Sequence, residues 1–348
     1  MKLFINKLLN NEILNSYNFA RNADIVFSET ILKDNFKSKN SKKYNLIYED
    51  DKKIFYVLNE FEISENQVIF CNTYMVNLLF EVLNVKSNLK NIKLITHQTD
   101  LPITEKLFRT KPDCISEWYS INVAYEHKNL HSIPLGLSNE YSPKNILKNH
   151  YKEKISENTN EKNDELYVNF QKNTNNKERG KLVKKLEKLD HVEVDEPKLS
   201  VNEYLEKLIK FKFIFSPHGN GIDTHRIWES IYAHSIPVTK KHPNFKTFND
   251  LPIIQLEEYS DFNIKKCNKI SETFDQSYFQ SEKLTINYWM EVIRNTKLPS
   301  DENVYYFSRY DEKLNYHINK YHNSERLNSR LKKIMYNIRR IKNFLYSE

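Results

Sequence analysis

The segment from Phe211 to Thr239 constrains the fold most, because it joins an apolar run, a glycine loop, a helix pattern and a second apolar run. The first run, FKFIFS, ends at Pro217, and the loop HGNG follows before the helix begins. A strand, a crossover helix and a second strand form a parallel pair packed against that helix. The segment therefore predicts a parallel α/β sheet with the loop at the carboxyl end of a strand.

Glycine is rare in this chain, which makes the loop unusual. The sequence has four glycines in 348 residues, and two of them are Gly219 and Gly221. Glycine is used where the backbone takes a positive φ or where another group must approach closely. Asp223 is a good N-cap for the helix that follows, and a helix N-terminus attracts anions. The loop is interpreted either as a tight turn or as a phosphate cradle.

Short apolar runs with helix patterns between them recur along the chain. They cover residues 24–28, 67–71, 92–96 and 130–135, and then 166–170, 191–194, 211–216, 236–239 and 252–256. The earlier runs do not alternate, as expected for parallel strands buried on both faces. A polar, charged segment at 144–164 is the expected linker. With 348 residues, the chain is expected to form domains at 1–150 and 165–298, followed by a tail at 299–348.

Charged residues on the helix after the loop suit a nucleoside diphosphate. Arg226 and Glu229 are three residues apart and share a helix face. A guanidinium suits phosphate oxygens, and a carboxylate suits paired ribose hydroxyls. Lys240 and Lys241 end the next strand and add positive charge at the same sheet edge. The alternative is a glycine turn beside a weak surface ion pair between Arg226 and Glu229.

The stretch FKFIFSPHGNGIDTHRIWESIYAHSIPV resembles the nucleotide-sugar-binding segment of exostosin-like glycosyltransferases, in which "GNGIDxxRxWE" leads to a helix and then "xIPV". The earlier phrase WYSINVAYEHKNLHSIPLGL is similar to the companion half of such two-domain enzymes. The resemblance is dense in the second half of the chain and looser elsewhere. It implies an α/β fold of GT-B type, with two Rossmann-like domains facing across a cleft and a C-terminal helical extension. It also implies that the second domain holds the nucleotide sugar and the first holds the acceptor.

Carried onto this chain, the resemblance places Arg226 at the diphosphate, Glu229 at the ribose and the glycine loop beside the phosphates. Lys177 and Arg179, in the polar loop after the first strand of the second half, are possible further contacts. The full set of expected donor-binding residues is His218, Gly219, Asn220, Gly221, Asp223, Thr224, Arg226, Glu229, Lys240 and Asn173.

A metal-independent, inverting transfer is the expected mechanism. The nearest acidic run, Glu49-Asp50-Asp51, is expected in an exposed turn, and the histidines match no compact zinc spacing. Positive groups near the loop would then balance the leaving diphosphate. No metal and no cofactor beyond the nucleotide sugar are expected.

An inverting transfer also needs a base for the acceptor hydroxyl. Asp100 and His97, at the end of the run 92–96, are the first candidates, followed by Glu126 and His127. Asp100 has an alternative role as a cap of the turn before Pro102. His218 is a further candidate, with a donor role to phosphate or sugar as the preferred interpretation.

The end of the chain, residues 324–348, predicts a basic amphipathic helix. Its apolar residues recur at four-three spacing at Leu327, Leu331, Ile334, Ile338, Ile341 and Leu345. Seven basic residues surround them. Such a helix lies on an anionic membrane face, docks on the body of the protein or pairs with another chain. No apolar stretch is long enough to span a membrane, and the three scattered cysteines, Cys71, Cys114 and Cys267, suit a reducing cytosol.

These features favour a cytoplasmic glycosyltransferase, with peripheral contact on the inner face of the membrane as one expectation. It would move a sugar from a nucleotide-sugar donor to a glycan or lipid-linked acceptor in surface polysaccharide or capsule synthesis. A non-catalytic nucleotide-binding or scaffold protein with the same cradle is the alternative. Nucleic acid is not an expected partner, because the net charge of +7 is modest and no recognisable nucleic-acid module is present.

Overall fold

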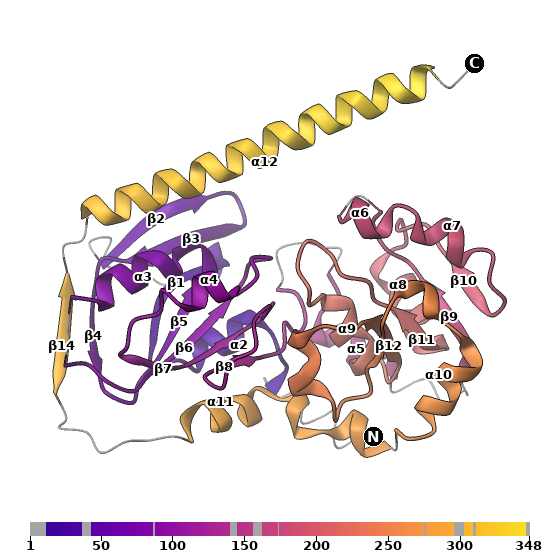
Figure 1. Ribbon diagram of the computed structural model, residues 1–348, viewed down its shortest axis with the longest axis horizontal. Coiled ribbons are helices and arrows are strands. Elements are labelled where there is room, and N and C mark those ends of the chain that lie inside the picture. Colours follow the sequence, from indigo (N-terminus) through magenta and orange to yellow (C-terminus); the bar gives the residue numbers. More distant parts are fainter. Residues whose placement is uncertain are drawn as a thin grey trace.

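The protein is described by a computed structural model that covers residues 12–36, 43–85, 88–139, 145–155, 162–172, 174–274, 276–295, 303–308 and 311–345. Two sheets lie side by side, and the long helix α12 crosses over the first of them (Figure 1). The helices are α2 (Ser16–Arg21), α3 (Val76–Leu83), α4 (Glu105–Phe108), α5 (Lys148–Ile155), α6 (Asn176–Arg179), α7 (Leu182–Leu186), α8 (Val201–Lys210), α9 (His225–Tyr232), α10 (Ile264–Ser271), α11 (Ile286–Arg294) and α12 (Asp311–Leu345).

The strands belong to three sheets, and most of them run parallel. They are β1 (Ile25–Leu32), β2 (Tyr44–Glu49), β3 (Lys53–Leu58), β4 (Glu60–Ser64), β5 (Val68–Asn72), β6 (Ile92–His97), β7 (Ile115–Ser120), β8 (Leu130–Ser132), β9 (Asn163–Val168), β10 (Val192–Val194), β11 (Phe211–Phe215), β12 (Ile236–Lys240), β13 (Ile254–Leu256) and β14 (Val304–Ser308). Short 3-10 turns lie at Lys33–Asn35, Thr73–Met75, Pro243–Phe248, Tyr259–Asp261, Gln276–Gln280 and Glu282–Leu284.

The first sheet has the order β2-β3-β1-β5-β6-β7-β8. From β1 to β8 its neighbouring strands are parallel, whereas β3 is antiparallel to both β1 and β2. The second sheet has the order β10-β9-β11-β12-β13 and is parallel throughout. The strands β14 and β4 form a separate antiparallel pair. The predicted mixed α/β class with parallel sheets is therefore confirmed.

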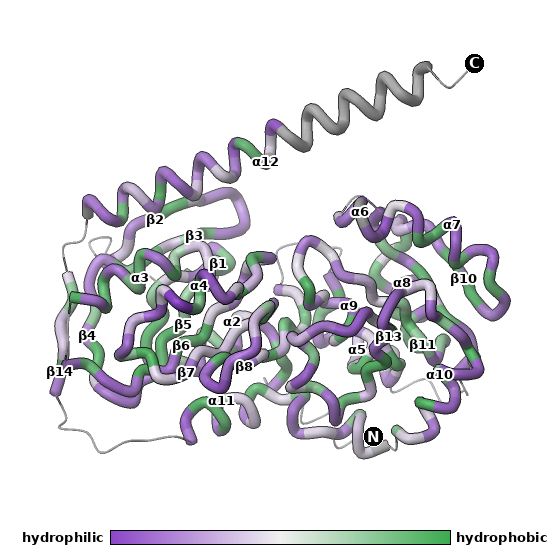
Figure 2. Tube along the Cα trace, in the orientation of Figure 1, coloured by the Kyte–Doolittle hydropathy of each residue, from purple (hydrophilic) through white to green (hydrophobic). Residues whose placement is uncertain are grey.

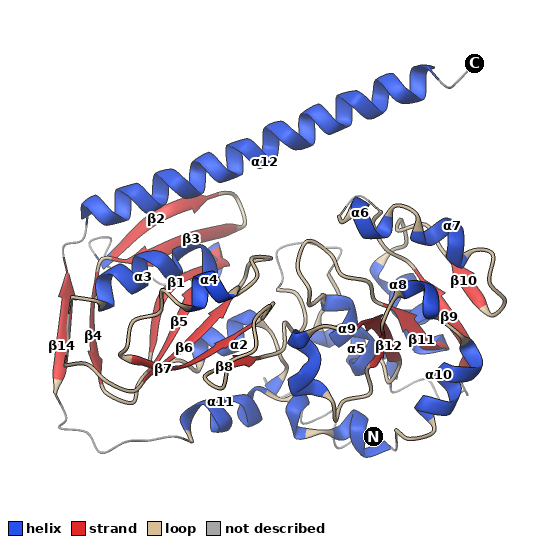
Figure 3. Ribbon diagram, in the orientation of Figure 1, coloured by secondary structure: helices blue, strands red, loops and turns tan. Residues whose placement is uncertain are grey.

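Helices cover both faces of each large sheet (Figure 3). On the first sheet, α3 and part of α12 pack over one face, while α2 and α11 lie on the other. On the second sheet, α8 and α9 cover one face, and α7 and α10 cover the other. The strands β5 and β6 are buried along their whole length, as expected for parallel strands between two helical layers. Their residues are largely apolar in the hydropathy colouring (Figure 2).

One apolar cluster is continuous between the two sheets. It includes Phe70 and Ile95 from the first sheet, and Phe211, Ile214 and Trp228 from the second half. Trp228 is fully buried. The two halves therefore share part of their core.

The segment predicted as a linker is partly structured. Residues 148–155 form α5, and Tyr151, with 4% of its surface exposed, donates a hydrogen bond to the carbonyl of Glu229 at 3.0 Å. The prediction of a plain linker is wrong for this part, because a buried tyrosine fixes the helix against α9. No helix among the described residues is long and apolar enough to cross a membrane.

Candidate functional site

The carboxyl end of the first sheet contacts the glycine loop that follows β11. Just after β7, Asn122 accepts through Oδ1 the hydrogen bonds of the backbone N–H groups of Ile222 and Asp223, at 2.8 and 2.9 Å. Its Nδ2 donates to the carbonyl of Thr99, just after β6, at 3.1 Å. One side chain therefore connects two strand ends of the first sheet to the loop of the second.

The two loop glycines, Gly219 and Gly221, differ in what excludes a larger side chain at their positions. A Cβ on Gly221 would lie 2.9 Å from both amide atoms of Asn122, so this glycine is required by contact with the first half. A Cβ on Gly219 would lie 3.4 Å from Nη2 of Arg179, which is a tight but milder contact. Neither glycine has a positive φ. The space beside Gly221 is therefore filled by the Asn122 side chain, and the space beside Gly219 borders the guanidinium of Arg179.

Asp223 is a buried structural carboxyl and does not cap α9. Its Oδ2 accepts from the N–H of Leu135 at 2.9 Å, and both carboxyl oxygens lie 3.0–3.1 Å from Nε1 of Trp228. Burial raises the pKa of this carboxyl to about 7. The predicted N-cap role is wrong because Thr224 occupies the N-cap position, and the Asp223 side chain is engaged by an indole and by the first half.

Arg226 and Glu229 share a helix face, as predicted, but a third residue joins them. Nε of Arg226 donates to the Tyr204 hydroxyl at 2.9 Å, and that hydroxyl donates to Oε2 of Glu229 at 3.1 Å. Tyr204 comes from α8, and Glu229 is only 9% exposed. Tyr204 and Arg226 are half-buried, so the three side chains form a partly buried chain of hydrogen bonds across two helices, and the alternative of a surface ion pair is wrong.

A second arginine, Arg179 at the end of α6, lies under the same loop. It is 5% exposed and donates to the carbonyls of Pro217 at 2.5 Å and His218 at 2.7 Å. Burial and, to a lesser extent, the nearby charge of Arg226 lower the pKa of Arg179 to about 10. Sequence reasoning named Arg179 only as a secondary contact, because its loop reads as a flexible polar segment.

The two guanidiniums have neutral hydrogen-bond partners. Arg179 is bound to backbone carbonyls and Arg226 to a phenol, and neither forms an ion pair with a carboxylate in the described part of the chain. Glu229 is near enough to act on Arg226 electrostatically. A buried and a half-buried positive charge without a directly bound anion are costly, and an anion between them would reduce that cost.

Two polar atoms next to these arginines have no hydrogen-bond partner among the described residues. They are Nε2 of His218 and Oγ1 of Thr224, and both are buried. Burial lowers the pKa of His218 to about 4, so its ring is neutral at pH 7. The side chains of Thr224 and Arg179 both lie within 4 Å of the Cβ position of Gly219. The guanidinium of Arg179 and the methyl group of Thr224 therefore lie beside Gly219, just before the start of α9.

The remaining residues predicted to contact the nucleotide sugar differ in whether their side chains are exposed or already paired. Lys240 is half-buried and forms an ion pair with Glu258 at 2.9 Å, which already balances its charge. Asn220 is exposed at the tip of the loop. Asn173 lies outside the described residues, as does the side chain of Lys177.

The two leading candidates for the base, His97 and Asp100, differ in exposure: His97 is buried and Asp100 is exposed. His97 is 1% exposed, its Nδ1 accepts from the N–H of Gln98 at 2.8 Å, and its Nε2 lies 3.4 Å from the carbonyl of Pro134. Burial lowers the pKa of His97 to about 3. In this conformation His97 supports the strand end and does not reach solvent, which sequence spacing did not reveal.

Asp100 is exposed and directly follows Thr99, whose carbonyl Asn122 binds. The next candidates, Glu126 and His127, line a groove of about 470 Å³ formed by residues 123–132 of the first half and 243–247 of the second. There Glu126 forms an exposed ion pair with Lys246 at 2.9 Å across the two halves. Asp100 is therefore linked to the glycine loop through its neighbour Thr99 and through Asn122.

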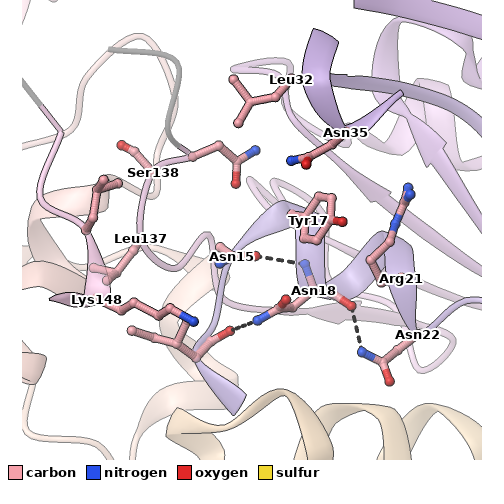
Figure 4. A pocket seen from close by; sticks show the side chains of 13 residues that line it. Asn15, Tyr17, Asn18, Arg21, Asn22, Leu32, Asn35, Leu137, Ser138 and Lys148 are labelled. Carbon is pink, nitrogen blue, oxygen red and sulfur yellow. Dashed lines mark hydrogen bonds between the residues drawn. The ribbon is translucent and has the colours of Figure 1, made fainter. Parts of the chain in front are cut away.

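A cavity of about 500 Å³ opens next to α2 (Figure 4). It is lined by α2 and its preceding turn, the end of β1 and the segment after Gly136. Amide side chains dominate the lining, which includes Asn15, Asn18, Asn22, Asn35 and Asn139. The carbonyl of Gly136, one residue before this lining, contacts Nδ1 of His225 at 2.8 Å. Sequence reasoning missed this cavity, because its residues come from four separated segments, the fourth being Leu147 and Lys148 at the start of α5.

Among the described residues there is no group of three or more histidine, cysteine or acidic side chains that could hold a metal. The acidic run at 49–51 lies in the turn between β2 and β3, where Asp50 accepts from the N–H groups of Lys52 and Lys53 at 2.8 Å. The predicted exposed turn is thus confirmed. No family model matches the chain, and no curated protein matches it with significant similarity.

Proposed function

We propose that the chain is a nucleotide-sugar-dependent glycosyltransferase of GT-B type, similar to the exostosin-like enzymes. The observation that carries the proposal is the pair Arg179 and Arg226 beside the first turn of α9, with no ion-paired carboxylate. A diphosphate supplies negative charge near both arginines and can accept hydrogen bonds from Arg226. The N–H groups in the first turn of α9 and the positive end of its helix dipole also favour an anion at this position.

In the proposed complex, the diphosphate lies above Gly219. It contacts Arg226 directly and accepts a hydrogen bond from Thr224 Oγ1. Arg179 acts as a positioning residue, because its hydrogen bonds fix the carbonyls of the loop. Glu229 uses Oε2 to accept from Tyr204, which leaves Oε1 for a ribose hydroxyl.

The acceptor would approach from the first half, since the carboxyl end of the first sheet meets the glycine loop. Asp100 is the proposed base, because it is exposed and adjacent to Thr99. Arg226 balances the charge that develops on the leaving diphosphate. A glycan or a lipid-linked saccharide used in surface polysaccharide synthesis is the proposed acceptor class.

The test is a thermal-shift screen with UDP-, GDP- and CMP-sugars. A ligand at about 100 times its Kd stabilises the folded protein by about 2.7 kcal/mol. Arg226→Ala should lose this response. Lys241→Ala is the matched control, because Lys241 is a basic residue at the same sheet edge that is exposed and paired with Glu257. An equal shift in Arg226→Ala and the parent protein would contradict the site.

Turnover separates the enzyme from the non-catalytic alternative. With the donor found in the screen, Asp100→Asn should retain nucleotide binding and lose sugar transfer or slow donor hydrolysis. Binding by the parent protein without turnover of the donor, alone or with any acceptor tested, would favour a nucleotide-binding scaffold instead.

A further inference from the structure

The first part of α12 is docked on the first half. Leu314 is 2% exposed and His317 is 4% exposed, with Nε2 of His317 3.0 Å from Oε1 of Glu81 on α3. Tyr321 packs its ring against Phe55 of β3, with centroids 5.3 Å apart. The docked face of α12 is therefore defined by positions 314, 317, 318 and 321.

Beyond these residues the described side chains of α12 become more exposed, although Glu325 still interacts with Tyr74 of the first half. Leu327 is 59% exposed, and its neighbours Glu325, Arg326, Ser329 and Arg330 are exposed as well. The helix continues to Leu345. Residues 326–345 are called distal α12 below, and its described side chains, Arg326, Leu327, Ser329 and Arg330, are exposed.

The apolar positions of distal α12 do not continue the docked face. At about 100° per residue, positions 327, 331, 334, 338, 341 and 345 form one stripe. The centre of that stripe lies about 130° around the helix from the centre of the docked face. Because the two faces differ, a helix docked through the first face can contact a separate surface through the stripe.

The charges of distal α12 all have the same sign. Its basic residues are Arg326, Arg330, Lys332, Lys333, Arg339, Arg340 and Lys342, and Glu348 is the one acidic residue from 326 to the end of the sequence. This short segment therefore carries +6 of the net charge of +7. Pairing with a second copy would place basic residues against basic residues, whereas stable helix pairs alternate charge signs across the seam.

We propose that distal α12 lies on an anionic lipid bilayer, with its aliphatic stripe in the interface and its basic residues at the lipid headgroups. A helix with a narrow aliphatic stripe flanked by Lys and Arg matches interfacial helices, which lie on the membrane without crossing it. Six aliphatic positions at regular spacing have no use in binding a phosphate backbone, so the composition favours lipid over nucleic acid. The proposal does not depend on the proposed function.

The test is co-sedimentation of the full-length protein with vesicles of phosphatidylcholine alone or with one quarter phosphatidylglycerol. Binding is expected only to the anionic vesicles, and it should weaken as salt rises from 50 to 300 mM. Arg330→Gln combined with Lys333→Gln should lower the partition coefficient about 25-fold, since each basic residue contributes about fivefold at such a surface. Ile334→Ser combined with Ile338→Ser should lower it by at least about tenfold.

The control is Met335→Ser combined with Tyr336→Ser, which removes two apolar residues away from the stripe of the same helix. This variant should bind anionic vesicles within about twofold of the parent. Equal binding to neutral vesicles, equal loss in both serine pairs, concentration-dependent dimerisation through the stripe, or binding to a DNA duplex in place of vesicles would each overturn the proposal. Nucleotide thermal shifts of the same variants should be unchanged, which separates failure here from failure of the donor site.

Discussion

At the scale of single residues, Asn122 and Gly221 form the contact on which the site depends most. The amide of Asn122 occupies the space that any larger residue at 221 would fill, and it satisfies two N–H groups of the loop. Glycine scarcity in the sequence pointed to this loop, but the partner is about 100 positions away. No local spacing rule connects residues so distant, and for the same reason Tyr204 was missed.

Substitution at the two glycines should therefore have unequal effects. Gly221→Ala should destabilise the protein by about 1–3 kcal/mol, because its Cβ would meet Asn122 at 2.9 Å. Gly219→Ala is the control and should cost less, since its nearest contact is 3.4 Å away at the end of a side chain. Urea unfolding measures both. Equal costs would show that the Asn122 contact does not constrain position 221.

Asp223 should make stability depend on pH. Its pKa is raised from 3.8 to about 7, so the folded state holds the proton more tightly than the unfolded state. This contribution is complete below about pH 4 and is lost as pH rises through about 7. Relative to Asp223→Asn, the free energy of unfolding of the parent should fall by up to about 1.4 kcal/mol per pH unit in that window. Urea titrations at pH 5, 6, 7 and 8 check this, and parallel pH profiles for the two proteins would contradict it.

At the scale of helices and strands, the sequence predicted the buried parallel strands best. Runs such as 67–71 and 92–96 are apolar because helices cover both faces of their sheet, and the structure places β5 and β6 there. The hairpin β2–β3 and the pair β4–β14 were not predicted. Their burial patterns mix exposed and buried positions, and β14 pairs with a strand more than 200 residues earlier.

Helix α12 offers a matched test of docking. Leu314→Ala should destabilise the protein by about 2–5 kcal/mol, because it removes a side chain that is 2% exposed in the core of the first half. Leu327→Ala, on the same helix but 59% exposed, should change stability by less than about 0.5 kcal/mol. Thermal or urea unfolding gives both values. A large effect at Leu327 would mean that distal α12 packs on the body.

At the scale of the whole molecule, several hydrogen bonds join the two halves besides those of Asn122. The N–H of Val123 donates to Asn244 at 2.9 Å, and the N–H of Leu14 donates to the Tyr232 hydroxyl at 3.1 Å. Later in the chain, Arg294 of α11 forms an ion pair with Asp24 of the first half at 2.9 Å. The first sheet takes its strands from residues 25–132 and the second from residues 163–256, while the shared core and these contacts make the halves interdependent.

This interdependence predicts one cooperative unfolding transition. The cluster that contains Phe70 and Trp228 is shared by both sheets, so neither half can open completely without exposing apolar surface of the other. Native-state hydrogen exchange in rising urea, read by mass spectrometry, should give the same opening free energy for peptides covering β5–β6 and β11–β12. The Leu314→Ala variant should then lower both values together, although Leu314 contacts only the first half. Two separate opening energies, or a drop confined to the first sheet, would instead mean that the halves fold as independent domains and that the cradle at α9 forms without the first sheet.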